Sequence, residues 1–214
     1  MDFPKIGNSV SLSDQAYFIM KDAIVNNKLQ PRQVLSEEAL ASQLGISRTP
    51  IRAAMRRLAF EHLISFSGKS AIVSDISEEE ILKVSTVRIA LEPVAARLAA
   101  GVMNEDHIEE LESLLEEQQT AMEKEDYSLY IRKEYEFHTF IAGCAQNEML
   151  QTMIEQVNVH VQRFLALSRT LQRYSGLAVN EHKLVIAALR QKNASLAENA
   201  LRQHVENVTN RIMI

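Results

Sequence analysis

The chain of 214 residues is poor in cysteine, glycine and proline. Its single cysteine, Cys144, excludes an intrachain disulfide, and six glycines with four prolines exclude a collagen-like repeat. An unpaired thiol is typical of proteins in a reducing cytoplasm. The sequence also lacks an apolar run long enough to span a bilayer and a basic-then-apolar signal peptide. We therefore expect a cytoplasmic protein with no membrane partner.

Acidic residues outnumber basic residues only slightly, and the net charge is −5. That average argues against a nucleic-acid binder, but it hides an uneven distribution. Residues 1–75 contain nine basic and seven acidic residues, whereas residues 76–214 contain fourteen basic and 21 acidic ones. Five of the six histidines also lie in the second part. Since the length suits two domains, we expect a mildly basic domain at 1–75 and an acidic, histidine-bearing domain at 76–214.

The first domain shows helical periodicity in three segments. Apolar residues recur at helical spacing in 14–28, and a short second helix is predicted at 37–44, ending at Gly45. A third helix opens at Ser47 after a turn of only a few residues, which makes a helix-turn-helix. Residues 63–73 then read as two short strands around a turn, so we expect a wing.

Basic side chains gather on the third predicted helix, the one that would enter the major groove. Arg48, Thr49, Arg52 and Arg56 lie near its start and along its outward side, and Lys69 lies in the wing turn. Arginine can bridge guanine or grip phosphate, and threonine can donate to phosphate. The alternative is that the arginines form a solvated helix face. The combination of turn, helix and wing favours DNA.

Residues 35–58, LSEEALASQLGISRTPIRAAMRRL, resemble the winged helix-turn-helix of the GntR family of bacterial transcription regulators. The stretch Ser-Arg-Thr-Pro-Ile-Arg is the most specific part of the match. The resemblance implies DNA contacts for Arg48, Thr49 and Arg52, with Lys69 in the wing. Arg32 and His62 stand where the family often has glycine, which predicts turns of a different shape at these two places.

The second domain reads as helices throughout, without strand-like alternation or a glycine-rich phosphate loop. A first helix at about 77–100 contains Pro93, which should kink or split it. Further helices are predicted at about 104–123, 127–145, 148–171, 178–191 and 194–212. The expected fold class is mainly α, with a winged helix-turn-helix followed by an all-α antiparallel helical bundle.

Titratable residues stand in this bundle where a core would normally be apolar. Glu134 and His138 are four residues apart and share one helix face, whereas His182 and His204 lie on two later helices. A carboxylate and imidazoles that converge from several helices are how bundles build metal sites. The alternative is that each histidine is a surface residue or a hydrogen-bonded core residue.

Residues 134–150 and 181–205 are similar to the FCD effector domain of the FadR-like subfamily. In its metal-binding members an aspartate and three histidines hold one divalent metal. The match places His138, His182 and His204 in the histidine positions and Glu134 where aspartate is usual. The resemblance thus implies one divalent transition metal per chain, with Zn, Ni, Co and Mn as candidates, and open positions for a small carboxylate effector.

Arg88, in the stretch VRIALE, is a candidate for binding that effector. The stretch is similar to the first effector-domain helix of the family, and a guanidinium can hold a carboxylate through two parallel hydrogen bonds. The alternative is an ion pair within the helix, because Glu92 follows four residues later.

Together these features predict a transcription repressor rather than an enzyme. It would bind palindromic double-stranded operator DNA as a homodimer, under control of a small carboxylate at the metal site. Three alternatives remain: a regulator that responds to the metal itself, a metal-free regulator with an apolar or acyl ligand, and a metal-dependent hydrolase. The hydrolase would need a general base, and the sequence offers none beyond the proposed ligands.

Overall fold

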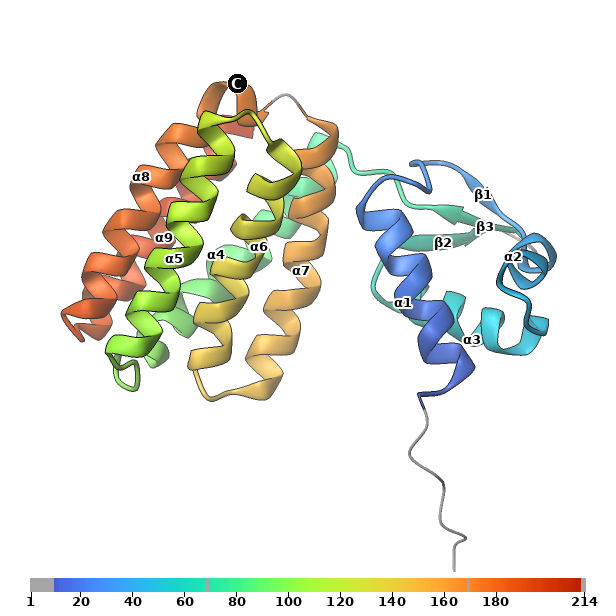
Figure 1. Ribbon diagram of the computed structural model, residues 1–214, viewed down its shortest axis with the longest axis horizontal. Coiled ribbons are helices and arrows are strands. Elements are labelled where there is room, and N and C mark those ends of the chain that lie inside the picture. The colour runs from blue at the N-terminus through green and yellow to red at the C-terminus, as the bar shows by residue number, and fades with distance from the viewer. Residues whose placement is uncertain (1–9, 68–69, 169, 213–214) are drawn as a thin grey trace, which may run out of the picture. The chain divides into compact units, whose positions relative to one another are not determined.

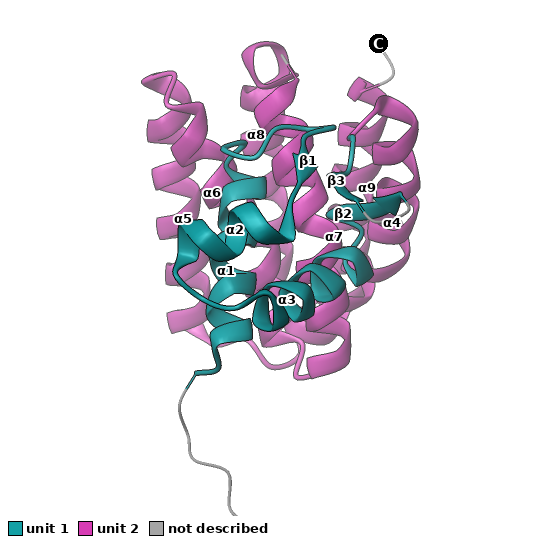
Figure 2. Cartoon of the chain, turned by 90° about the vertical axis from the view of Figure 1, so that its right-hand side faces the viewer, with its two compact units in different colours: residues 1–75 teal, residues 76–214 magenta. Residues whose placement is uncertain are grey.

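Two units make up the chain, residues 1–75 and residues 76–214, shown in teal and magenta in Figure 2. The computed structural model describes residues 10–67, 70–168 and 170–212. Helices dominate both units, so the expected mainly α fold class is confirmed (Figure 1). None of the helices in the described ranges combines the length and the apolar character needed to cross a membrane.

The first unit contains the predicted helix-turn-helix. Its helices are α1 (Leu12–Val25), α2 (Glu37–Leu44) and α3 (Arg48–Phe60). The Ser36 side chain accepts a hydrogen bond from the Ala39 amide at 3.3 Å, which caps α2. Gly45 ends α2 in the left-handed conformation, at φ +65°. The core between the helices is apolar and includes Met20, Ile24, Ile51, Met55 and Leu58.

A three-stranded antiparallel sheet completes this unit. Its strands are β1 (Val34–Leu35), β2 (Ile64–Ser67) and β3 (Ser70–Val73), in the order β1-β3-β2. The hairpin of β2 and β3 is the predicted wing, with Ile64 opposite Val73. The sequence did not predict β1, because two residues are too few to show alternation. Lys69, which follows β2 and precedes β3 in the sequence, lies outside the described residues.

Arg32 and His62, the two residues at glycine positions of the family, keep a glycine-like backbone. Their φ angles are +65° and +57°, in the left-handed region that favours glycine, so neither substitution takes the backbone out of that region. Surrounding contacts hold the strained residues in place. The Arg32 amide donates to the Val73 carbonyl at 2.9 Å, and the Arg32 Nε donates to Asp75 Oδ2 at 2.8 Å.

Gly45→Ala is expected to destabilise the protein by about 1 kcal/mol, because an L side chain is strained at a left-handed φ. A Cβ at this position would meet no atom within 4 Å, so the loss would come from the backbone alone. The matched control is Gly101→Ala, since Gly101 has φ −77° and a Cβ there would lie 3.7 Å from the Leu98 carbonyl oxygen. Urea denaturation measures both variants. An equal loss in both would contradict the prediction.

The second unit is the predicted helical bundle, with helices side by side in Figure 1. The helices are α4 (Glu78–Ala100), α5 (Glu105–Glu123), α6 (Tyr127–Cys144), α7 (Glu148–Leu167), α8 (Thr170–Arg190) and α9 (Ala194–Ile212). Helix α4 packs against α9 and α7, and α5 packs against α6 and α8. Helix α8 begins eight residues before its predicted start at 178. It includes Gly176, and tertiary packing overrides the low helix propensity of that residue.

Pro93 does not split α4, which runs unbroken from Glu78 to Ala100. A proline nitrogen cannot donate, so the carbonyl of Ile89 loses its usual partner within the helix. Arg202 of α9 replaces that partner, because its Nη1 donates to the Ile89 carbonyl oxygen at 3.3 Å. The hydrogen bond that proline removes from α4 is therefore supplied by the last helix of the bundle.

Candidate metal centre and nucleic-acid interface

Four titratable side chains meet inside the bundle. Glu134 and His138 come from neighbouring turns of α6, His182 comes from α8 and His204 from α9. Each offers one ligand atom, and these atoms all lie within 4.8 Å of one another. The four residues are between 0 and 5% exposed. The structure thus brings together the four residues that the sequence singled out as metal ligands.

The three imidazoles turn the same nitrogen, Nε2, toward the centre of this cluster. Nε2 of His138 lies 3.3 Å from Glu134 Oε1, and Nε2 of His182 lies 3.3 Å from Nε2 of His204. The Glu134 carboxylate is 3.8 Å from Nε2 of His182 and 3.9 Å from Nε2 of His204. Phe137 stacks on the His182 ring, with 4.0 Å between centroids, and so holds that ring in place.

The other ring nitrogen, Nδ1, faces an acceptor in each of the three histidines. The acceptors are Glu92 Oε2 for His138 at 2.8 Å, Gln118 Oε1 for His182 at 2.9 Å and Glu181 Oε2 for His204 at 3.0 Å. The first contact is close enough for a hydrogen bond but poorly aligned, and the other two are well formed. Such outer acceptors orient metal-binding histidines and raise the basicity of the inner nitrogen.

The hydrogen bonds fix which nitrogen of His182 and His204 carries the proton. Gln118 donates its Nε2 to Glu134 Oε2 at 2.6 Å, so its Oε1 must accept from Nδ1 of His182. The Glu181 carboxylate likewise accepts from Nδ1 of His204. Burial lowers the pKa of both histidines, to the greater extent for His182, and therefore favours neutral rings. Each neutral ring then presents a lone pair at Nε2.

Two such lone pairs at 3.3 Å repel each other unless a cation lies between them. The Glu134 carboxylate adds a negative charge: burial would raise its pKa, but contacts with the ring nitrogens around it, including the hydrogen bond with His138, hold the pKa well below its usual value. Three imidazole nitrogens and one carboxylate are a donor set for Zn, Ni, Co or Mn. The chemistry of the cluster therefore fits a divalent transition metal.

Arg88 lies beside the cluster and is 1% exposed. Its Nε donates to Glu92 Oε1 at 2.6 Å, which is the ion pair within α4 that the sequence offered as the alternative. Its Nη2 is also 3.3 Å from Nε2 of His138, so its charge reaches the edge of the cluster. Glu92 accepts a further hydrogen bond from Asn158 at 2.9 Å. Sequence reasoning missed the role of Glu92 as a partner of His138.

A small cavity of about 30 Å³ borders the cluster at Glu134. Helices α6, α7, α8 and α9 form its walls, which are mostly apolar. Glu134 and Arg211 both line it. Sequence reasoning did not single out Arg211.

The predicted DNA-reading residues lie around one groove of the first unit, with a volume of about 640 Å³. Arg48, Arg52 and Arg56 line it, together with Glu37 and Glu38 from the start of α2. Arg52 forms a double hydrogen bond with Glu37, at 2.9 Å from Nε and 2.7 Å from Nη2. This contact with Arg52 lowers the pKa of Glu37.

The remaining residues of the predicted interface differ in their surroundings. Arg48 Nη2 is 3.0 Å from Glu38 Oε2, and Thr49 is exposed on the first turn of α3. Arg57 lies outside the groove lining, because its guanidinium packs 3.6 Å from the ring centroid of Tyr17.

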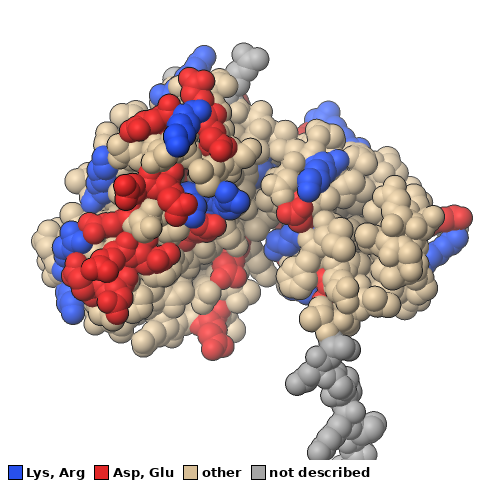
Figure 3. All heavy atoms as spheres, in the orientation of Figure 1, with Lys and Arg blue, Asp and Glu red and all other residues tan. Residues whose placement is uncertain are grey.

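On the face that Figure 3 shows, acidic side chains gather over α5 of the other unit. The basic groove and the acidic surface therefore belong to different units.

Two family models match the chain. Residues 12–73 match the bacterial regulatory proteins of the gntR family, and residues 83–207 match the FCD domain. The chain is similar to the HTH-type transcriptional repressor RspR of Escherichia coli (strain K12), with 26% identity over 92% of this chain and 87% of that protein. It is 30% identical to the probable D-xylose utilization operon transcriptional repressor of Paenarthrobacter nicotinovorans, over 87% of this chain and 84% of that protein.

A solved structure resembles both units. The structure of E. coli McbR/YncC has a TM-score of 0.82 and 26% identity, and the match covers 96% of this chain and 98% of that one. The FCD match alone spans more than half of the chain. The family and these relatives are transcription regulators and not enzymes. The chain therefore belongs to the GntR family of bacterial regulatory proteins with an FCD domain, and it is a DNA-binding transcription regulator.

Proposed function

We propose that this regulator is a repressor that holds one divalent transition metal in its bundle and responds to a small carboxylate. The proposed metal site is supported above all by Nε2 of His182 and Nε2 of His204. Both nitrogens are hydrogen-bond acceptors, and they face each other at 3.3 Å in a buried cluster. Glu134, His138, His182 and His204 would hold the ion. A divalent ion there would supply a Lewis-acidic site that attracts an anionic ligand.

The DNA-binding half of the proposal rests on the groove of the first unit. Arg48, Arg52 and Arg56 place three guanidinium groups around it, within reach of base edges and phosphates. We also assign DNA contacts to Thr49 at the start of α3 and to Lys69 in the wing. A homodimer with two-fold symmetry would present two such heads, which suits a palindromic operator with two half-sites.

The proposed response to a small carboxylate is supported by positive charge beside the cluster. Arg88 keeps its guanidinium at the edge of the site while Glu92 and Asn158 fix the surrounding network. A carboxylate can switch the protein only if it binds the DNA-competent and DNA-incompetent states with different affinity. Coupling of this kind typically changes affinity by roughly 5- to 150-fold.

Operator affinity is expected to change by at least about fivefold when the right small carboxylate is added. The DNA is a site selected by the wild-type protein from a randomised double-stranded pool, and the acids are tested one at a time on metal-loaded protein. No change with any acid would contradict control by a carboxylate. Affinity that follows free metal but no organic acid would identify the ion itself as the effector.

A further inference from the structure

Arg211 lies in the wall of the cavity that borders the cluster at Glu134. Among the described residues that line this cavity, Arg211 is the only cation, and Glu134 of the cluster lines it too. The remaining wall is mostly apolar, with Leu165, Leu171, Ala178 and Val208 among its residues. An anion that enters an apolar space needs a charged partner, and arginine can bind a carboxylate through two parallel hydrogen bonds.

Arg211 is tied to the cluster through one carboxylate, that of Glu181. Nη1 of Arg211 donates to Glu181 Oε2 at 3.2 Å, and Nη2 of Arg211 donates to Glu181 Oε1. The same Oε2 accepts from Nδ1 of His204 at 3.0 Å. The Arg211 and Glu181 side chains are only 13 and 15% exposed. Glu181 is thus shared between a cavity-lining cation and a histidine of the cluster.

Arg88 is likewise held by a carboxylate, since Glu92 accepts from its Nε and its Nη2 at 2.6 and 3.3 Å. Unlike Arg211, however, Arg88 does not belong to the cavity lining. A carboxylate that enters the cavity would therefore meet Arg211 and not Arg88. The cavity is also small, since about 30 Å³ holds one or two water molecules, so it must widen even for acetate.

We propose that Arg211 binds the carboxylate of the effector and that this contact draws Arg211 away from Glu181. The inference rests on the proposed control by a small carboxylate and names the residue that recognises it. Glu181, once released from Arg211, becomes a stronger acceptor for the Nδ1 proton of His204, which raises the basicity of the inner nitrogen. Binding of an anion in the cavity and binding of metal at the cluster therefore favour each other, by the same factor in both directions.

The test uses the full chain loaded with cobalt and titrated with acetate, with acetamide as an uncharged ligand of the same shape. The readouts are the visible absorption of the cobalt, the thermal unfolding midpoint and the cobalt affinity in competition with a chelator. The variants are Arg211→Gln, Arg211→Lys and, as the matched control, Arg190→Gln. Arg190 is an exposed arginine at the end of α8 that pairs with Glu112 at 2.8 Å, away from the cavity.

Acetate, but not acetamide, is expected to shift the absorption and the midpoint of the wild-type protein and to tighten its cobalt binding. Arg211→Gln should weaken the acetate response roughly tenfold or more, because a buried charge-assisted hydrogen bond is lost. Arg211→Lys keeps the charge without the planar fork and should fall in between. Arg190→Gln should respond as the wild type does.

The proposal is overturned if acetate leaves the wild type unchanged, or if Arg211→Gln responds as strongly as the wild type. A response lost in Arg88→Gln but kept in Arg211→Gln would assign the contact to Arg88 instead. If Arg211→Gln does not fold, the acetate response of Arg211→Lys is compared with that of the wild type instead. Failure of the wild type to bind cobalt would contradict the proposed metal site, whereas an acetate-induced rise in the midpoint that needs Arg211 would still support this inference.

Discussion

Replacing His138 and His182 together with alanine is expected to reduce the bound transition metal from about one ion per chain to none. The variant removes ligands from two different helices, α6 and α8. What remains is one carboxylate and one imidazole, too few to hold the ion against its hydration. Elemental analysis of tag-free protein, purified without chelator, measures the ratio of metal to chain.

The same variant should lose the stabilisation that the metal provides. A ligand present at a thousand times its dissociation constant stabilises the folded state by about 4 kcal/mol. A chelator should therefore lower the unfolding midpoint of the wild type and leave the midpoint of the double variant unchanged. Thermal unfolding with and without chelator gives this comparison.

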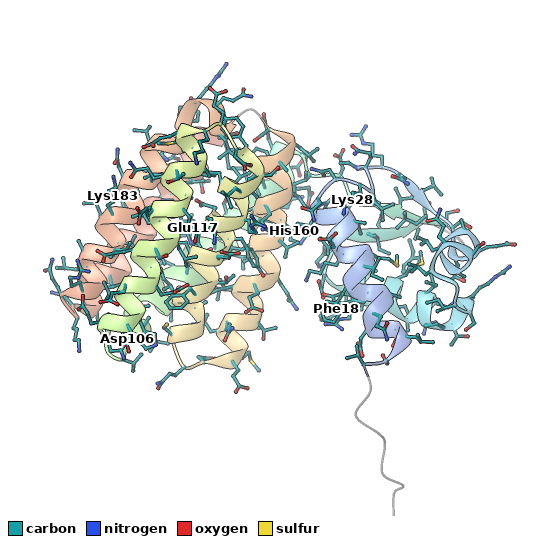
Figure 4. The ribbon with its side chains drawn as sticks, in the orientation of Figure 1. Phe18, Lys28, Asp106, Glu117, His160 and Lys183 are labelled. Carbon is teal, nitrogen blue, oxygen red and sulfur yellow. The ribbon has the colours of Figure 1, made fainter. Side chains whose placement is uncertain are left out.

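His160→Ala is the control for the double variant. His160 is a half-buried histidine of α7, labelled in Figure 4, and it is not part of the cluster. This variant should keep its metal. Absence of metal from the wild type, even after incubation with excess Zn, Ni or Mn, would remove the proposed site. Retention of metal by the double variant would place the binding site elsewhere.

Arg52→Ala is expected to weaken operator binding by about 1–3 kcal/mol, or roughly 5- to 150-fold. Glu37 holds both Nε and Nη2 of Arg52, which fixes the plane of the guanidinium in the groove. An arginine held in this way loses little side-chain freedom on binding DNA. Fluorescence anisotropy with a selected operator, repeated over a range of salt concentrations, measures the loss.

The salt dependence shows what Arg52 contacts. If it contacts a phosphate, the slope of log affinity against log salt falls by about one in the variant and binding weakens on all sequences. If Arg52 contacts a base edge, the slope is the same in the variant and the wild type. The variant then discriminates less strongly between bases at one position of the operator. Lys28→Ala is the control, since Lys28 is an exposed residue just after α1 that pairs with Asp22 and does not line the groove (Figure 4). Unchanged affinity in both Arg48→Ala and Arg52→Ala would identify a different reading surface.

The bounds of an element could be predicted where the sequence has a capping residue at its start and a terminating residue at its end. Helix α2 has the predicted bounds, 37–44, because Ser36 caps its start and Gly45 ends it. The start of α8 was placed too late, at residue 178 and not at Thr170. In the structure Gly176 lies inside the helix, where packing and not local propensity decides.

The candidate metal site could be predicted only in part. Spacing places Glu134 and His138 on one face of a helix, but the partners of Nδ1 depend on packing. Gln118, for example, lies 64 residues from His182 in the sequence. Arg211 left a weak signal, since it follows His204 by two helical turns and shares its face. Only the fold shows that Glu181 joins the two.

The bond between Arg202 and the Ile89 carbonyl has a consequence for how the protein is made. It joins the first and last helices of the bundle across 113 residues. While the ribosome is still adding α9, the carbonyl that Pro93 leaves free has no partner from that helix. His204 emerges just after Arg202, so the bundle closes and the cluster gains its last histidine at nearly the same moment. The contact that completes the hydrogen bonding of α4 and the last histidine of the cluster are therefore both supplied by α9.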